Sequence, residues 1–149
     1  MGKYAYKMGV NFQNFAFLCP GQASQKIGMC KDLYEKDGFA RSNIDKASDI
    51  LDCDIKSIMF NGPDEVLKQT IYTQPAMFIS SYIIGSLLMS NGFKPTCAAG
   101  HSLGEFSAFA LAGAFNFEEG LKLVKVRSEA MHDAGLKNPG AMAAVIGLE

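Results

Sequence analysis

The stretch Ala99-Gly100-His101-Ser102-Leu103-Gly104-Glu105, AGHSLGE, decides how this chain of 149 residues is interpreted. Its pattern Gly100-x-Ser102-x-Gly104 is typical of a nucleophile elbow, in which a serine occupies a strained turn between a strand and a helix. The two glycines let neighbouring backbone pass without Cβ clashes. A simple helix N-cap is the other interpretation of Ser102, but it explains neither the glycines nor the small residues that follow. We therefore expect a serine nucleophile at Ser102.

Composition narrows the class of protein. Hydrophobic residues make up 48% of the chain and charged residues 19%, which fits a soluble globular domain and excludes a disordered one. The net charge of −1 gives no electrostatic reason to expect nucleic acid or an anionic membrane as partner. The start of the chain has no apolar signal region. The longest apolar stretch, 76–89, is too short and too polar to span a bilayer.

The four cysteines lie far apart, without the spacing of a zinc or redox site. No metal and no cofactor are expected. Cys19 and Cys97 fall inside short apolar runs, where a cysteine behaves as a small buried hydrophobe. This usage favours a reducing cytoplasm over a secreted disulfide framework.

Apolar runs and turn residues predict strands that alternate with helices. Strands are expected at 15–19, buried and stopped by Pro20-Gly21, at 96–99, and in the apolar run 140–149. Helices are expected around 44–51, from Thr73 and Pro75 to Asn91-Gly92, over 105–114 with burial on all sides, and over 117–134 before Gly135. The alternation favours an α/β fold with a largely parallel sheet. Because a parallel strand is normally followed by elements that cover it, the chain is expected to be the first part of a larger domain.

A serine nucleophile needs a base, and the chain has two histidines. Adjacent residues in a sharp turn point their side chains apart, so His101 is expected to support the substrate site and not to take the proton of Ser102. His132 shares a polar helix face with Lys122, Lys125, Glu129 and Asp133 and is expected at the surface. We therefore find no convincing base.

The helix expected over 117–134 places one charge on its apolar face. That face carries Arg127 among uncharged residues: Gly120, Leu123, Val124, Ala130, Met131 and Ala134. Burying a guanidinium is unfavourable unless something pairs with it. Arg127 could extend to the edge, pair with a structural carboxylate, or hold the carboxylate of a substrate in its bidentate fork. The third option suggests acyl transfer from a substrate with a free carboxylate.

Five motifs occur in a family-like order: PGQASQ (20–25), YTQPA (72–76), GHSLGE (100–105), VKVRSEAM (124–131) and GAMAAVIG (140–147). Together they resemble the malonyl-CoA:acyl carrier protein transacylase family and the acyltransferase domains of fatty acid and polyketide synthases. The resemblance covers nearly everything from residue 15 onward. It implies an N-terminal extension over 1–14 and the N-terminal part of an acyltransferase domain over 15–149. The implied core is a partial α/β-hydrolase-like parallel sheet, truncated before an inserted ferredoxin-like subdomain.

The resemblance also implies roles for individual residues. Ser102 would take the malonyl group as an ester, and the backbone N–H groups of Gln22 and Leu103 would form the oxyanion hole. Arg127 would pair with the malonyl carboxylate, and Gln74 would lie near the pocket. The implied partners are malonyl-CoA and acyl carrier protein, in fatty acid biosynthesis. The family's catalytic histidine lies outside this chain, so the chain alone is expected to be poorly active.

One departure and two alternatives accompany the resemblance. Ala23 stands where the family usually has glycine, which would be strained if the position needs a positive φ. A small serine esterase or thioesterase would share the elbow but would have no use for Arg127. A non-catalytic module that binds acyl carrier protein or a partner subunit would need that partner to cover its open sheet edge.

Overall fold

The computed structural model describes residues 14–140, 145 and 147. Their elements follow in the order β1 (Ala16–Cys19), α1 (Lys31–Lys36), α2 (Gly38–Leu51), α3 (Ile55–Asn61), α4 (Asp64–Leu67), α5 (Thr70–Ser90), β2 (Cys97–Gly100), α6 (Gly104–Leu111) and α7 (Phe117–Lys137). The strand expected at 140–149 lies outside the described residues, apart from residues 140, 145 and 147, and stays a prediction.

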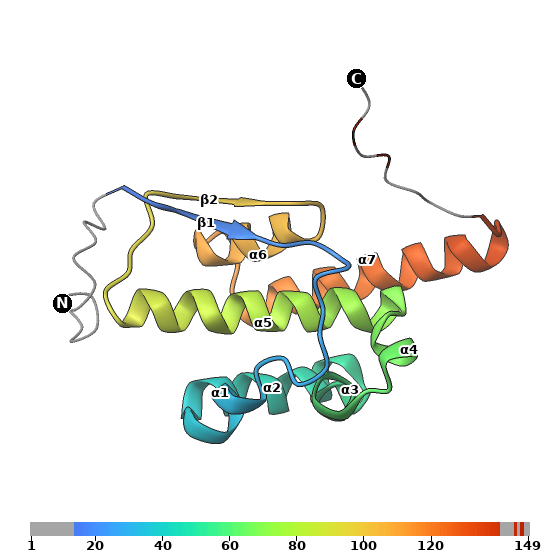
Figure 1. The fold of residues 1–149 in the computed structure, drawn as a ribbon, viewed down its shortest axis with the longest axis horizontal. Coiled ribbons are helices and arrows are strands. Elements are labelled where there is room, and N and C mark those ends of the chain that lie inside the picture. Colours follow the sequence, from blue (N-terminus) through green and yellow to red (C-terminus); the bar gives the residue numbers. More distant parts are fainter. Residues whose placement is uncertain (1–13, 141–144, 146, 148–149) are drawn as a thin grey trace.

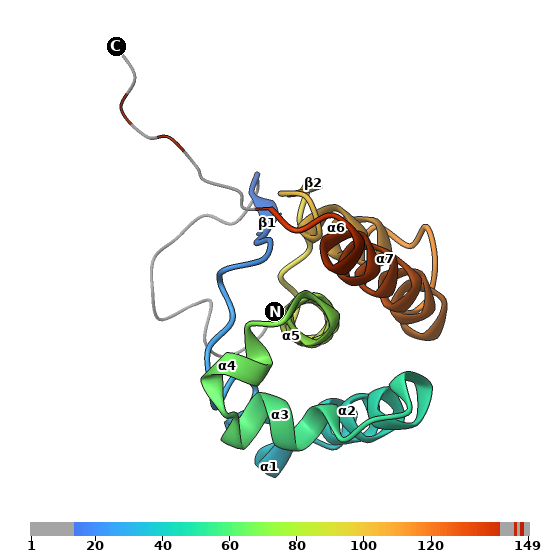
Figure 2. The same ribbon diagram turned by 90° about the vertical axis from the view of Figure 1, so that its right-hand side faces the viewer.

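Helix α5 lies at the centre of the described part, with other elements on several sides of it (Figure 1, Figure 2). The strands β1 and β2 pair in parallel, with Ala16 opposite Cys97 and Cys19 opposite Gly100. Helix α6 packs against both strands and against α5, and α7 runs beside α5. The helices α1 to α4 lie on the side of α5 away from the sheet. The expected α/β class with a parallel sheet is confirmed.

Helix α5 forms because nearly every side of it is apolar. Phe78, Ile79 and Ile83 are fully buried, and complete burial of a side chain of this size contributes about 1.5–3 kcal/mol. The helix begins at Thr70, earlier than the start expected near Thr73, and Pro75 lies inside it. Proline is favoured at the first position of a helix, which is why the start was expected near Pro75. Here the surrounding core buries residues 73–75 and holds the proline within the helix.

The sheet is less buried than its apolar sequence predicts. In β1 only Cys19 is buried, whereas Leu18 is 79% exposed. In β2 Cys97 is exposed, so the expectation of a buried cysteine is wrong there. Side chains alternate between the two faces of a strand, and the pairing register puts the exposed Leu18 and Cys97 on the same face of the sheet. Helix α6 is also not buried all round, since Phe109 is 56% exposed.

Helix α7 begins with a capping box, in which Asn116 and Glu119 exchange side-chain to backbone hydrogen bonds of 2.9 and 3.0 Å. Its buried face differs from the expected one. The buried residues are Phe117, Gly120, Leu121, Val124 and Ser128, whereas four members of the expected stripe are exposed: Leu123, Ala130, Met131 and Ala134. The helix also continues past Gly135. Packing against α5 sets this face, and Arg127 lies half-buried at its edge.

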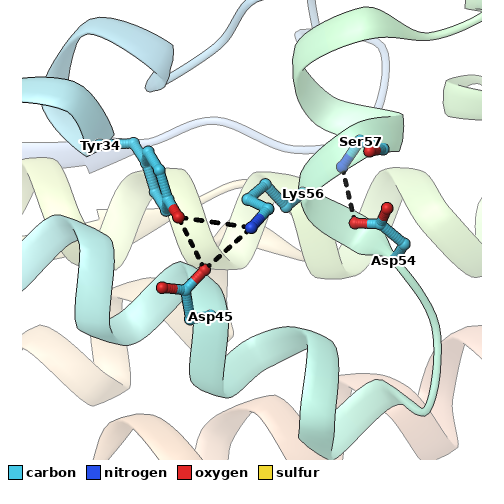
Figure 3. A network of polar contacts seen from close by, with 5 residues as sticks. All are labelled: Tyr34, Asp45, Asp54, Lys56 and Ser57. Atoms are coloured by element: carbon cyan, nitrogen blue, oxygen red, sulfur yellow. Dashed lines mark hydrogen bonds and ion pairs between the residues drawn. The ribbon is translucent and has the colours of Figure 1, made fainter.

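A polar network joins the three helices α1, α2 and α3 (Figure 3). The Tyr34 hydroxyl donates to Asp45 Oδ1 at 3.0 Å, and Lys56 Nζ lies 3.2 Å from the same oxygen. Beside the network, Asp54 caps α3 by accepting a 3.0 Å hydrogen bond from the backbone N–H of Ser57. That hydrogen bond lowers the pKa of the Asp54 carboxyl below its ordinary value. These contacts hold helices α1, α2 and α3 together, and α2 and α3 pack against α5.

Candidate active site

The elbow has the geometry that its two glycines predict. Strand β2 ends at Gly100, α6 begins at Gly104, and Ser102 between them has a φ of 55°. A Cβ on Gly100 would lie 2.0 Å from the backbone carbon of Gly104, and a Cβ on Gly104 would lie 2.0 Å from the carbonyl oxygen of Cys19. Neither distance is possible for a real side chain. Both glycines are therefore required for this turn, and the strained serine conformation is confirmed.

The loop after β1 is held against the elbow by backbone contacts. The N–H of His101 donates to the carbonyl oxygen of Cys19 at 3.1 Å. A Cβ on Gly21 would lie 2.6 Å from the His101 carbonyl oxygen, so the two segments are in direct contact. Within residues 14–140, neither Gln22 nor Leu103 uses its backbone N–H in a hydrogen bond to the protein. These two donors lie on the two segments that meet here.

Ala23 adopts the conformation at which an alanine is strained. Its φ is 79°, in the region that favours glycine. The turn is held by a 2.9 Å hydrogen bond from the Ala23 N–H to Gln25 Oε1. The side chain of Gln22 anchors the same loop to the start of α5, because its Nε2 donates to Thr70 Oγ1 at 3.2 Å.

The guanidinium of Arg127 lies directly beside the candidate nucleophile. Its Nη2 donates to Ser102 Oγ at 3.0 Å, and its Nη1 donates to Oε1 of Gln74, which is fully buried. Gln74 in turn donates from Nε2 to Met131 Sδ at 3.2 Å. The Arg127 Cζ lies over the ring of Phe106, 5.7 Å from its centre. The structure therefore brings Ser102, Gln74 and Arg127 together.

Arg127 has a neutral set of partners. The salt bridges among the described residues join lysines to Glu118, Asp45 and Asp64, and none involves Arg127. The structural carboxylate that was one possible explanation of Arg127 is thus absent from this part of the chain. A guanidinium held by an amide and a hydroxyl keeps its positive charge available to an anionic group.

The described part of the chain provides no base in contact with the serine. Ser102 Oγ is hydrogen-bonded to Arg127, and neither His101 nor His132 contacts it in this way. His101 is exposed and His132 is half-buried. The nearby Cys19 is not a competing nucleophile, because burial raises the pKa of its thiol and keeps it protonated.

The described residues contain neither a metal-binding cluster nor a membrane-spanning helix. No group of three His, Cys, Asp or Glu side chains there is arranged to hold a metal ion. Among these residues, no helix combines the length and the apolar character that a bilayer crossing requires.

Three residues of this region escaped the sequence analysis. Phe106 directly follows the GHSLGE motif, but its contact with Arg127 joins two helices. Met131 was counted only as a core residue, and Thr70 precedes the expected start of its helix. The contacts of the last two depend on tertiary packing that no local pattern reports.

Comparison with known proteins assigns the family. The family model of the acyl transferase domain matches residues 16–148, and the chain belongs to this family. It is 41% identical over 134 residues to the malonyl CoA-acyl carrier protein transacylase of Bacillus subtilis (strain 168), covering 90% of this chain and 42% of that protein. The protein of the same name from Escherichia coli (strain K12) is 39% identical over 136 residues, with 91% and 44% covered.

Solved structures agree with this assignment. The malonyl-CoA:ACP transacylase of Synechocystis sp. PCC 6803 superposes with a TM-score of 0.78 at 40% identity, covering 82% of this chain and 41% of that one. A malonyl-transacylase solved in complex with a type II PKS acyl-carrier protein gives a TM-score of 0.76 at 38% identity, covering 82% and 40%. The chain thus spans less than half of the length of these relatives.

Proposed function

We propose that the protein transfers a malonyl group from malonyl-CoA to the phosphopantetheine thiol of acyl carrier protein, as a step of fatty acid biosynthesis. The observation that carries this proposal is the contact between Ser102 and Arg127. It pairs a nucleophile in a strained elbow with a guanidinium that has no carboxylate partner in the described part of the chain. The relatives named above supply the identity of the acyl group and of its acceptor.

The proposed reaction has two steps through a seryl ester. In the first, Ser102 Oγ attacks the thioester carbonyl of malonyl-CoA, the C–S bond breaks, and the hydroxyl proton ends on the CoA thiol. In the second, the carrier protein thiol attacks the ester, the C–O bond breaks, and the thiol proton returns to Ser102. A general base moves the proton in both steps, and we assign this role to the family histidine that lies outside this chain.

Backbone donors are proposed to stabilise the charge that develops on the substrate carbonyl. The N–H groups of Gln22 and Leu103 lie on segments in direct contact and have no acceptor within residues 14–140. Leu103 also precedes the N-terminus of α6, where the helix dipole favours negative charge. Removing one such donor typically reduces kcat by about 100- to 1000-fold.

The remaining residues are proposed to bind and orient substrate. The Arg127 fork would accept the malonyl carboxylate, with Gln74 holding the fork in place. His101 would line the entrance, where its side chain is exposed. We further propose that residues 15–149 form the N-terminal part of an acyltransferase domain, after an extension over 1–14. A cytoplasmic location is consistent with four free cysteines.

Transfer onto purified holo-acyl carrier protein tests the proposal. The chain is incubated with malonyl-CoA and carrier protein, with imidazole as external base, and the carrier mass is followed. We expect malonyl-carrier to form with the wild type and not with Ser102→Ala. Equal formation with both would contradict the proposal. Hydrolysis of neutral esters that survives Arg127→Ala, without preference for malonyl-CoA, would instead identify an esterase.

A further inference from the structure

We infer that Phe106 is a positioning residue that holds the Arg127 guanidinium at the acyl site and thereby sets the preference for acyl groups with a free carboxylate. The inference rests on the proposed function, because it concerns the group that Arg127 binds. The GHSLGE motif (100–105) ends at Glu105 and does not include Phe106. Its role follows from contacts in the structure.

The guanidinium of Arg127 is held by two hydrogen bonds and one aromatic contact. Gln74 Oε1 and Ser102 Oγ accept hydrogen bonds from Nη1 and Nη2. The Phe106 ring supplies the third contact, with Cζ 5.7 Å from the ring centre. A cation within about 6 Å of an aromatic face is attracted by the ring quadrupole. Phe106 therefore adds a restraint on the position of the fork that the two hydrogen bonds do not supply.

The position of Phe106 couples the fork to the nucleophile. Phe106 lies four residues after Ser102, in the first turn of α6, and its backbone N–H donates to the carbonyl oxygen of Leu103 at 3.0 Å. The elbow and the first turn of α6 together therefore carry the nucleophile, a proposed oxyanion donor and the support of the arginine. The ring is half-buried and packs against the core, which limits its own movement.

This arrangement matters most when a carboxylate replaces Ser102 Oγ as the partner of Nη2. The fork then loses its contact with the elbow, and two restraints from the protein remain, Gln74 and Phe106. Leucine at position 106 would keep apolar packing but would remove the quadrupole. The charged fork would then be free to turn toward water, and affinity for a carboxylate-bearing acyl group would fall while affinity for a neutral one would not.

The test compares the binding of malonyl-CoA and acetyl-CoA by calorimetry. All proteins carry Ser102→Ala, so that no acyl transfer occurs during the titration. Phe106→Leu removes the ring, Phe106→Tyr retains it, and Phe109→Leu is the matched control on the same helix. A parallel NMR measurement follows the guanidinium protons of Arg127, which the ring current of an aromatic face shifts.

We expect Phe106→Leu to weaken malonyl-CoA binding by about threefold to tenfold, as the loss of a cation–π contact predicts, and to leave acetyl-CoA binding unchanged. Phe106→Tyr should restore both the affinity and the Arg127 proton shift, and Phe109→Leu should change neither. If Phe106→Leu does not fold by circular dichroism, Phe106→Met replaces it with the same expectation.

The outcomes separate this inference from the proposed function. If the malonyl preference is lost in Arg127→Ala but kept in Phe106→Leu, the positioning role of Phe106 is wrong and the proposed function stands. If Arg127→Ala keeps the preference, or the parent protein has none, the proposed function itself is wrong. Equal weakening of both ligands by Phe106→Leu would also overturn the inference, because it indicates general damage to the pocket.

Discussion

Arg127 Nη2 and Ser102 Oγ lie 3.0 Å apart, although 25 positions separate the two residues in the chain and they belong to different elements. A positive charge is therefore in contact with the candidate nucleophile before any substrate binds. An acyl group attached to Ser102 keeps its carboxylate within reach of Arg127 only if few atoms separate its two carbonyl carbons. Under the proposed function, this contact favours a short dicarboxylic acyl group such as malonyl.

Replacing Arg127 by alanine should remove this preference. Charge-assisted hydrogen bonds contribute about 1.5–3 kcal/mol, so malonyl ester formation at Ser102 should fall by about 10- to 100-fold, and acetyl ester formation should not fall with it. Rates are measured by mass spectrometry of the Ser102 peptide with each thioester. Arg127→Lys keeps the charge but not the fork and should recover only part of the rate. An unchanged ratio of the two rates in Arg127→Ala would contradict the role of the fork.

The strained alanine in the loop after β1 predicts an unusual stabilisation by glycine. Ala23 has a φ of 79°, a conformation that costs an alanine about 1–2 kcal/mol. Glycine loses more backbone freedom on folding than alanine, which lowers the free energy of unfolding by about 0.5–1 kcal/mol. Relief of the strain outweighs this loss, so Ala23→Gly should raise the free energy of unfolding by about 0.5–1 kcal/mol in urea denaturation. The control Ala112→Gly, at a φ of −78°, should lower it. Destabilisation by both substitutions would show that position 23 is not strained.

The second glycine of the elbow should tolerate no side chain. A Cβ at Gly104 meets the Cys19 carbonyl oxygen at 2.0 Å, so Gly104→Ala should lower the free energy of unfolding by about 3 kcal/mol, the upper end of overpacking effects. Gly135 also lies in a helix, but a Cβ there meets nothing within 4 Å. Gly135→Ala should therefore stabilise by about 0.5–1 kcal/mol. Thermal melts of the two variants measure the contrast, and equal shifts would argue against the close approach.

The Asp54 cap predicts an acid-sensitive contribution to stability. The pKa of its carboxyl is lowered in the folded state by the hydrogen bond from Ser57, so the ionised cap stabilises the fold above the unfolded pKa of about 4. This contribution is lost as the pH falls through the lower folded pKa. Asp54→Asn keeps a cap that does not titrate. The stability of the wild type relative to Asp54→Asn should therefore decline below about pH 4, and a difference independent of pH would contradict this.

The sequence predicted the elements that depend on local signals. The elbow was predictable because its glycines, its strand and its small-residue helix are contiguous. The class of fold followed from alternating strands and helices. Arg127 was identified because one charge on an apolar helix face is conspicuous, although the buried face of α7 proved to be rotated from the expected one.

What escaped prediction depends on contacts between distant segments. The start of α5 and the inclusion of Pro75 result from burial in the core, which outweighs capping signals. The exposure of Leu18 and Cys97 depends on how the helices pack against the sheet, which no pattern within either strand reports. The contact of Phe106 with Arg127 joins two helices, and no pattern within either helix reports it.

The most direct test of the central claim is the identity of the acyl group that forms an ester on Ser102. The chain is incubated separately with malonyl-CoA and acetyl-CoA in the presence of imidazole, and peptides are mapped at intervals by mass spectrometry. We expect a malonyl ester on Ser102, absent from Ser102→Ala, that forms at least about 10-fold faster than the acetyl ester, because the malonyl group gains a charge-assisted contact. An ester on another residue, equal rates with both thioesters, or no ester with either would contradict it.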